Sequence, residues 1–172
     1  MEKYEIYGGR KNPLEFKSIV MQRIHDFRSC GNLFEYSFFQ NIMEELMLFA
    51  MYSEQQIEEF YKEIISMLDM PKFKLVRMIP RDIENCIKNI RAERVNEQGE
   101  EVWYPLLMSY LSSSNYGKKH GVSNFDDIIT HFKRRMELEN RVIRLMPEGC
   151  CIHVESKNYE ITDILSALTE GL

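Results

Sequence analysis

Hydrophobic residues recur at helical spacing along residues 32–69, and this pattern predicts two consecutive amphipathic helices. Each predicted helix opens with a capping pattern, in which a small polar residue stands three positions before Glu or Gln. Asn32 stands in this relation to Glu35. Ser53 stands in the same relation to Gln56. The hydrophobic stripe comprises Phe39, Ile42, Met43, Leu46, Met47, Phe49 and Ala50, and then Ile57, Phe60, Tyr61, Ile64 and Leu68.

Further helices are predicted on both sides of this helix pair, because a polar cap or a proline again precedes a hydrophobic stripe. The first of them extends to about Cys30, and the longest covers residues 124–145. The predicted starts are Asn12 with Pro13, Pro80, Ser123 with Asp126 three positions later, and Thr162.

Short β-segments are predicted between these helices. Residues 72–79 alternate basic and apolar side chains at their start and predict a strand, and residues 3–7 predict another. A turn at Gly99 predicts one hairpin, and a turn across Ser156–Asn158 predicts another at the C-terminal end. The predicted fold class is therefore α+β and mainly helical, with about five helices including the acidic pair and with short antiparallel strands or hairpins.

The chain length favours one domain over residues 1–172. Residues 112–123 are rich in Ser, Gly and Asn and predict a loop. Such a loop is long for a structureless connection inside a compact domain, which suggests mobility or a functional role. Leu106 to Leu111, just before it, are apolar without a decisive period, and Pro105 is expected to stop the preceding segment.

Composition indicates a reducing compartment and a genome rich in AT. Four cysteines are too few for a disulfide scaffold at this length, and no apolar run is long enough to span a membrane. The acidic N-terminus lacks the apolar segment of a secretory signal, so we expect a cytoplasmic protein. Three alanines against seventeen isoleucines reflect AT-rich codons rather than helix propensity, which favours a low-GC bacterium or its phage as the source.

Charge is distributed unevenly along the chain, whose formal net charge is −5. Residues 33–70 contain eight acidic residues and one lysine, so the helix pair is expected to present a strongly negative outer surface. Residues 71–99 contain seven Lys or Arg against four Asp or Glu. Phosphate contacts dominate nucleic-acid affinity, so an acidic protein is a poor non-specific binder, although a local basic face can still bind. Mixed-sign charge is also the ordinary state of a protein surface.

Candidate chemistry in the sequence is weak. Cys150, Cys151 and His153 resemble metal ligands, but alternation along a strand places only Cys151 and His153 on one face, too few for zinc. Asp127 and His131 lie four residues apart on one side of the predicted long helix. This spacing suits two ligands of a metal ion, or a histidine that a carboxylate orients. Zincin, di-iron, nucleophile-elbow and phosphate-loop motifs are absent. We therefore expect no cofactor, no metal and no enzymatic activity, and an enzyme with Asp127 and His131 or Cys151 and His153 at its centre is the third alternative.

The charge pattern favours a non-enzymatic, regulatory protein-binding function. In this hypothesis the acidic helices face a basic partner protein, and a concrete version is a phage or mobile-element inhibitor that mimics phosphate charge against a nucleic-acid-binding enzyme. The apolar residues beyond the main stripe leave self-association open. The alternative is a nucleic-acid-binding accessory protein that uses the basic segment and a contact loop at residues 116–120. The candidate partner-binding residues are Glu44, Glu45, Glu58, Glu59 and Glu63, and the alternative nucleic-acid-binding residues are Lys72, Lys74, Arg77, Arg81, Arg91, Lys118 and Lys119.

Overall fold

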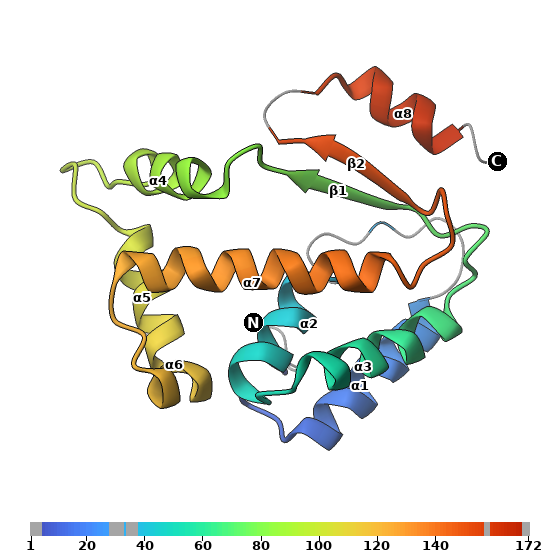
Figure 1. The fold of residues 1–172 in the computed structure, drawn as a ribbon, viewed down its shortest axis with the longest axis horizontal. Helices are drawn as coiled ribbons and strands as arrows, with labels where there is room; N and C mark the ends of the chain where they lie inside the picture. Colours follow the sequence, from blue (N-terminus) through green and yellow to red (C-terminus); the bar gives the residue numbers. More distant parts are fainter. Residues whose placement is uncertain (1–4, 28–32, 34–37, 157–158, 170–172) are drawn as a thin grey trace.

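The computed structural model describes residues 5–27, 33, 38–156 and 159–169, and this part of the chain is mainly helical with one small sheet (Figure 1). The coarse prediction of a mainly helical fold with short strands is confirmed. The described residues form more helices than the five predicted. The elements are α1 (Pro13–Phe27), α2 (Gln40–Glu44), the π-helix η1 (Glu45–Phe49), α3 (Glu54–Met67), β1 (Leu75–Ile79), α4 (Ile83–Glu93), α5 (Trp103–Ser113), α6 (Asn115–His120), α7 (Phe125–Ile143), β2 (Cys151–Glu155) and α8 (Ile161–Thr169).

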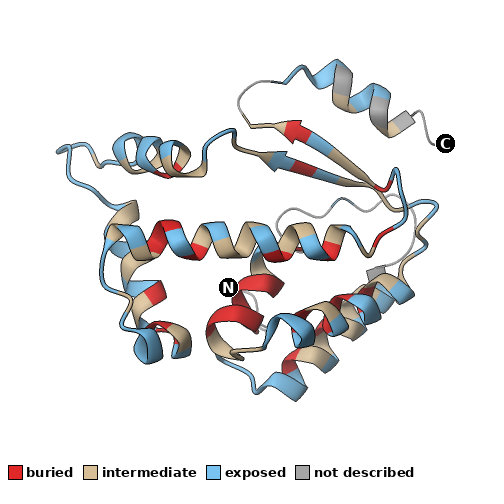
Figure 2. Cartoon of the chain, viewed as in Figure 1, coloured by how far each residue is buried: buried red, intermediate tan, exposed pale blue. Residues whose placement is uncertain are grey.

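The long helix α7 runs through the middle of the molecule and organises the other elements (Figure 1). Helices α1 and α3 pack together on one side of it, β1, β2 and α4 lie on the other, and α5 and α6 lie near its N-terminal end. The buried side chains concentrate where α2, η1, α3 and α7 meet (Figure 2). Fully buried Tyr61 and Ile64 of α3 and Leu138 and Val142 of α7 belong to this core.

The sheet contains two strands, and they are parallel rather than antiparallel as predicted. Leu75 pairs with Cys151 and Ile79 with Glu155. A parallel pair requires a long crossover, and helices α4 to α7 supply it here. The predicted hairpin after residue 150 was therefore wrong, because β2 pairs with β1 and the chain enters α8 at Ile161.

The other predicted β-segments are reduced or fall outside the description. The turn at Gly99 closes a single antiparallel bridge between Val95 and Glu101, without extended strands. Residues 5–7 are not in a strand, and residues 3 and 4 lie outside the described part of the chain.

Several predicted helix caps are confirmed. Asn12 Oδ1 accepts hydrogen bonds from the backbone of Leu14 and Glu15 at the start of α1. Ser53 and Gln56 form the predicted capping box of α3. The predicted Asn32–Glu35 cap lies outside the described residues, as does Cys30.

Two predicted caps are displaced along the sequence. The capping box of α7 is formed by Asn124 and Asp127, one residue beyond the predicted Ser123 and Asp126. At the C-terminal end, α8 begins at Ile161, so Thr162 lies in its first turn rather than at its cap.

The predicted loop at residues 112–123 is largely helical. Helix α5 continues to Ser113, and Ser114 caps α6 by accepting a hydrogen bond from the Gly117 N–H. Pro105 does not end a secondary-structure segment, because it lies in the first turn of α5. Backbone N–H groups in the first turn of a helix have no helical acceptor, so proline is tolerated there. Among the described residues, we find no helical segment with the length and hydrophobicity that a bilayer crossing requires.

Candidate functional site

A buried ion network joins α2 to α7. The Glu44 side chain lies inside the protein, with the residue 9% exposed, and its carboxylate accepts hydrogen bonds from two residues of α7. His131 Nε2 lies 2.8 Å from one carboxylate oxygen. Arg135 Nη1 lies 2.7 Å from the other. The carboxylate can only accept, so the proton of His131 facing it must be on Nε2.

The network continues along α7 to the sheet. Arg135 Nε lies 3.2 Å from the Glu139 carboxylate, and Arg77 Nη2 of β1 lies 3.0 Å from the other oxygen of that carboxylate. Arg77 also donates to the Asn140 side chain and to the Met136 carbonyl. Glu44 and Glu139 supply two carboxylates to this network, and each of them has an arginine partner within the protein.

The environment of Glu44 keeps it ionised. Burial alone would raise the pKa of this carboxyl, but the hydrogen bonds and positive charges of His131 and Arg135 outweigh it and lower the pKa below its ordinary value. A buried charge of this kind is tolerated only because its partners satisfy it.

Glu45, the next residue, is also buried but points elsewhere. Its carboxylate accepts hydrogen bonds from the backbone N–H groups of Gly8, at 2.6 Å, and Gly9. Burial raises the pKa of Glu45 in spite of these two donors. Successive residues on a helix differ by about 100° in direction. The Glu44 carboxylate therefore contacts α7, whereas the Glu45 carboxylate contacts the Gly8–Gly9 turn.

Glu44 and Glu45 therefore do not form the outer acidic surface that the sequence predicted. The charge count alone could not show this, because the partners lie far away in sequence. His131 is 87 residues from Glu44, and Gly8 is 37 residues from Glu45.

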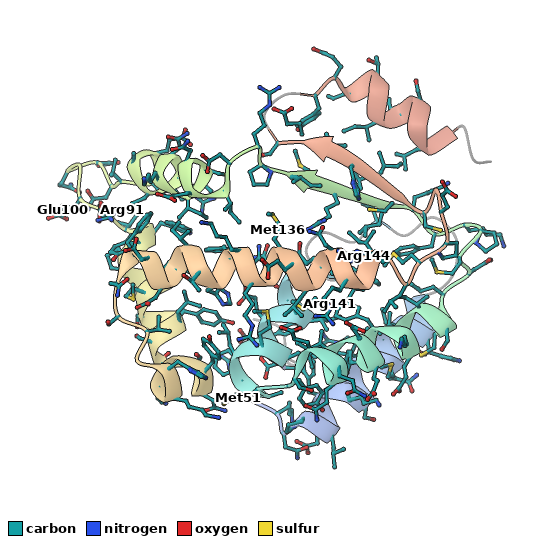
Figure 3. The ribbon with its side chains drawn as sticks, in the orientation of Figure 1. Met51, Arg91, Glu100, Met136, Arg141 and Arg144 are labelled. Atoms are coloured by element: carbon teal, nitrogen blue, oxygen red, sulfur yellow. The ribbon has the colours of Figure 1, made fainter. Side chains whose placement is uncertain are left out.

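The remaining predicted acidic residues lie on the outside of α3, where basic side chains approach them. Glu58 and Glu54 are ion-paired with Arg141 of α7, which points from α7 toward α3 (Figure 3). Glu63 is paired with Lys17 of α1 at 2.5 Å. Glu59 is exposed and accepts a hydrogen bond from Gln55.

The predicted basic segment does not form a free cationic face. Arg77 is 7% exposed and is occupied in the buried network, which corrects its assignment to a nucleic-acid surface. Most of the others are paired with acidic side chains or with backbone. The pairs are Lys72 with Asp69, Arg81 with Glu155, Lys88 with Glu84, Arg91 with Glu101, and Lys74 with the Gly149 carbonyl. Lys118 and Lys119 are exposed at the end of α6.

A cleft of about 740 Å³ opens above the buried network, between α4, α5, α7 and β1. Ile87 and Ile90 of α4 form an apolar wall that faces Phe132 and Met136 of α7. Figure 3 shows Met136 projecting from α7 toward the β1 and α4 side. The carboxylate of Glu44 and the guanidinium groups of Arg77 and Arg135 lie along the cleft lining, so the network forms part of its wall.

Several polar side chains in this cleft have no hydrogen-bond or ion-pair partner among the described residues, and the three largest are Arg94, Trp103 and Tyr110. Burial, followed by the negative charges of Glu44 and Glu45, raises the pKa of the Tyr110 hydroxyl, so it stays protonated and able to donate. Sequence patterning missed this site because its residues come from five separate elements. In the sequence, Glu139 is a charged residue that interrupts the hydrophobic stripe of α7, and this interruption is a local signal of the site.

The predicted Asp127–His131 pair is not formed. Asp127 Oδ2 accepts hydrogen bonds from the backbone of Ser123 and Asn124 and caps α7, whereas His131 contacts Glu44. In β2, burial raises the pKa of the Cys151 thiol, and His153 is exposed. Within the described ranges, no three His, Cys, Asp or Glu side chains are placed to hold a metal ion.

Comparisons with known proteins give no family for this chain: no family model, curated protein or solved structure matches it significantly.

Proposed function

We propose that the protein is a non-enzymatic binding protein, and that its ligand is a small organic anion with an apolar or aromatic body, held in the cleft between α4 and α7. The cleft is the single observation that carries this proposal. Its volume of about 740 Å³ falls in the range of about 300–1,000 Å³ that ligand sites occupy. An apolar wall with a few convergent polar groups is the usual composition of such sites.

The charge of the ligand follows from the charges around the cleft. Arg77 and Arg135 are already balanced by two glutamates, but Arg94 has no ion pair among the described residues. The cleft lining therefore carries one excess positive charge. The indole N–H of Trp103 and the hydroxyl of Tyr110 add two neutral donors, and all three groups suit an acceptor such as a carboxylate, sulfonate or phosphate. The ring surfaces of Trp103 and Phe132 favour a flat apolar body.

Titration with anilinonaphthalene sulfonate, an aromatic anion that fluoresces in apolar surroundings, tests this proposal. We expect saturable 1:1 binding to the folded protein. Arg94→Glu reverses the excess charge, and Ile90→Trp fills the apolar wall. Each substitution is expected to raise the dissociation constant about tenfold, which corresponds to the loss of one good contact.

Lys62→Glu is the matched control for the charge reversal, because Lys62 is an exposed residue of α3 and is not part of the cleft lining. Its dissociation constant should equal that of the wild type. The dye also binds loosely packed states, so near-UV circular dichroism must show native packing in each variant. A dissociation constant unchanged by both cleft substitutions would contradict the proposal.

A second candidate function is the recognition of a basic partner protein by α3, as the charge pattern of the sequence suggests. One observation favours it: Glu54, Glu59 and Glu63 are exposed along α3, with Lys62 as its only basic residue. A labelled oligolysine peptide serves as the probe. We expect Glu59→Lys with Glu63→Lys to weaken its binding, measured by fluorescence anisotropy at low salt, where surface charges are least screened. Equal binding by the double variant and the wild type would remove this candidate.

A further inference from the structure

A second, smaller pocket of about 150 Å³ lies between α7, α6 and η1. Its α7 residues are Asp127, Thr130, His131 and Arg134, which recur at helical spacing. The α7 residues of the larger cleft follow the same spacing five positions later, from Phe132 to Glu139. Five residues correspond to a rotation of about 140° around a helix axis, so the two cavities occupy different sides of α7.

The most informative group in this pocket is the imidazole of His131. The residue is only 6% exposed, and its Nε2 is engaged with Glu44. The other ring nitrogen, Nδ1, has no hydrogen-bond partner among the described residues. No buried side-chain nitrogen or oxygen in this part of the chain lacks a partner. Nδ1 is therefore accessible, and the pocket that the ring lines is its route to solvent.

Further donors surround the same space. The guanidinium of Arg134 lies 5.3 Å from the centre of the Tyr116 ring and has no ion pair among the described residues. The His120 ring lies 4.3 Å from the same Tyr116 ring on α6. Thr130 adds a hydroxyl to the lining. The pocket thus brings together one guanidinium, two imidazoles and a hydroxyl.

Two carboxylates oppose these donors, and both are already engaged. Asp127 lines the pocket, but its Oδ2 accepts hydrogen bonds from two backbone N–H groups, at 2.8 and 3.0 Å. Glu44 lies behind His131, and Arg135 balances its charge. Asp127 and Arg134 give the lining opposite formal charges, and Arg134 is the one of the two without a hydrogen-bond or ion-pair partner among the described residues.

We propose that this pocket binds a phosphate-class oxyanion, with Arg134, His120 and Thr130 as donors. His131 is a further donor through Nδ1 when its ring carries a proton on both nitrogens. A liquid water occupies about 30 Å³, so the space of about 150 Å³ accommodates a tetrahedral anion of five heavy atoms. Guanidinium groups are the side chains best suited to phosphate oxygens. The proposal does not depend on the ligand of the larger cleft, because the two cavities use different side chains of α7.

Isothermal titration with inorganic phosphate at constant ionic strength tests the proposal, together with NMR of the ring nitrogens of His131. We expect saturable binding with a dissociation constant of about 1 mM or lower, and a shift of the Nδ1 signal of His131. Arg134→Gln is expected to weaken binding at least tenfold. Lys133→Gln, the neighbouring exposed residue that does not line the pocket, should bind phosphate as the wild type does.

A phosphate monoester such as phenyl phosphate distinguishes the two sources of the anion. Tighter binding of the ester than of inorganic phosphate would identify the phosphoryl group of a larger molecule as the ligand, whereas exclusion of the ester would identify free phosphate. Both outcomes support an oxyanion site. The proposal is overturned if phosphate does not saturate, if Arg134→Gln and Lys133→Gln behave alike, or if the His131 signals do not move. Thr130→Val, on the exposed surface of α7, is a second test if Arg134→Gln disturbs the fold.

Discussion

Replacement of Glu44 with alanine is expected to lower the free energy of unfolding by about 3–5 kcal/mol, because removal of one partner leaves the others buried and uncompensated. His131 would lose the acceptor of its Nε2–H, and Arg135 would lose its contact at 2.7 Å. Urea denaturation followed by circular dichroism measures the change. A loss of this size would identify Glu44 as a central element of the core rather than as a surface charge.

Glu59→Ala is the matched control, since Glu59 is an exposed glutamate of the neighbouring helix α3. Its effect should stay within about 0.5 kcal/mol, as for most surface substitutions. If Glu44→Ala were as mild as this control, the buried network would contribute nothing to stability and its description as a structural element would be wrong.

The pH dependence gives a second, independent check on the same residue. The pKa of Glu44 is lowered in the folded protein, so its ionised form stabilises the fold. This stabilisation is present above the ordinary pKa of 4.5 and is lost as the pH falls through the lowered pKa. The advantage of the wild type over Glu44→Gln should therefore shrink in acid.

Glu45 should show the opposite sign, because its pKa is raised by burial. Its contribution is greatest below the ordinary pKa and is lost as the pH rises through the raised value. The advantage of the wild type over Glu45→Gln should thus shrink toward alkaline pH. Two adjacent glutamates with opposite pH trends would be difficult to explain by any general effect of net charge.

These two residues also show where sequence patterning succeeds and where it fails. Hydrophobic period located α1, α3, α4 and α7, and the predicted caps of α1 and α3 are the observed ones, because those signals are local. The predicted start of α4 at Pro80 was wrong, because Asp82 caps a helix that begins at Ile83. The same reasoning placed Glu44 and Glu45 on a solvated face, since acidic residues are rarely buried without partners. The partners come from α7 and from the Gly8–Gly9 turn, and nothing local links them to α2.

The sheet and the two cavities were missed for a related reason. Whether β1 and β2 pair in parallel depends on the path of the four helices that connect them. The sequence of a five-residue strand does not indicate that path. Arg77 was assigned to a basic surface from its charge, yet its position in β1 turns it toward Asn140 and Glu139. Each cavity likewise collects residues from several elements, so its composition became visible only with the fold.

Gly117→Ala is expected to destabilise the protein by about 3 kcal/mol, at the upper end of the range for overpacking. A Cβ atom at this position would stand 1.9 Å from the Leu111 carbonyl oxygen and 2.8 Å from Ser112 Cα. These are backbone atoms, so α6 must move away from the end of α5. Helix propensity alone predicts the opposite sign, because alanine is favoured over glycine by about 1 kcal/mol in a helix. Thermal and urea unfolding of the variant therefore decide between local propensity and tertiary contact.

Gly121→Asn is the matched control for this glycine. Gly121 ends α6 with a φ of 70°, and a Cβ there would meet nothing within 4 Å. Asparagine tolerates this conformation better than other side chains, so the loss should be well below that at Gly117. If Gly117→Ala were as stable as the wild type, the close contact between α5 and α6 would be wrong. Because Tyr116 and His120 reach the small pocket from α6, a real displacement of α6 should also weaken phosphate binding, whereas Gly121→Asn should leave it intact.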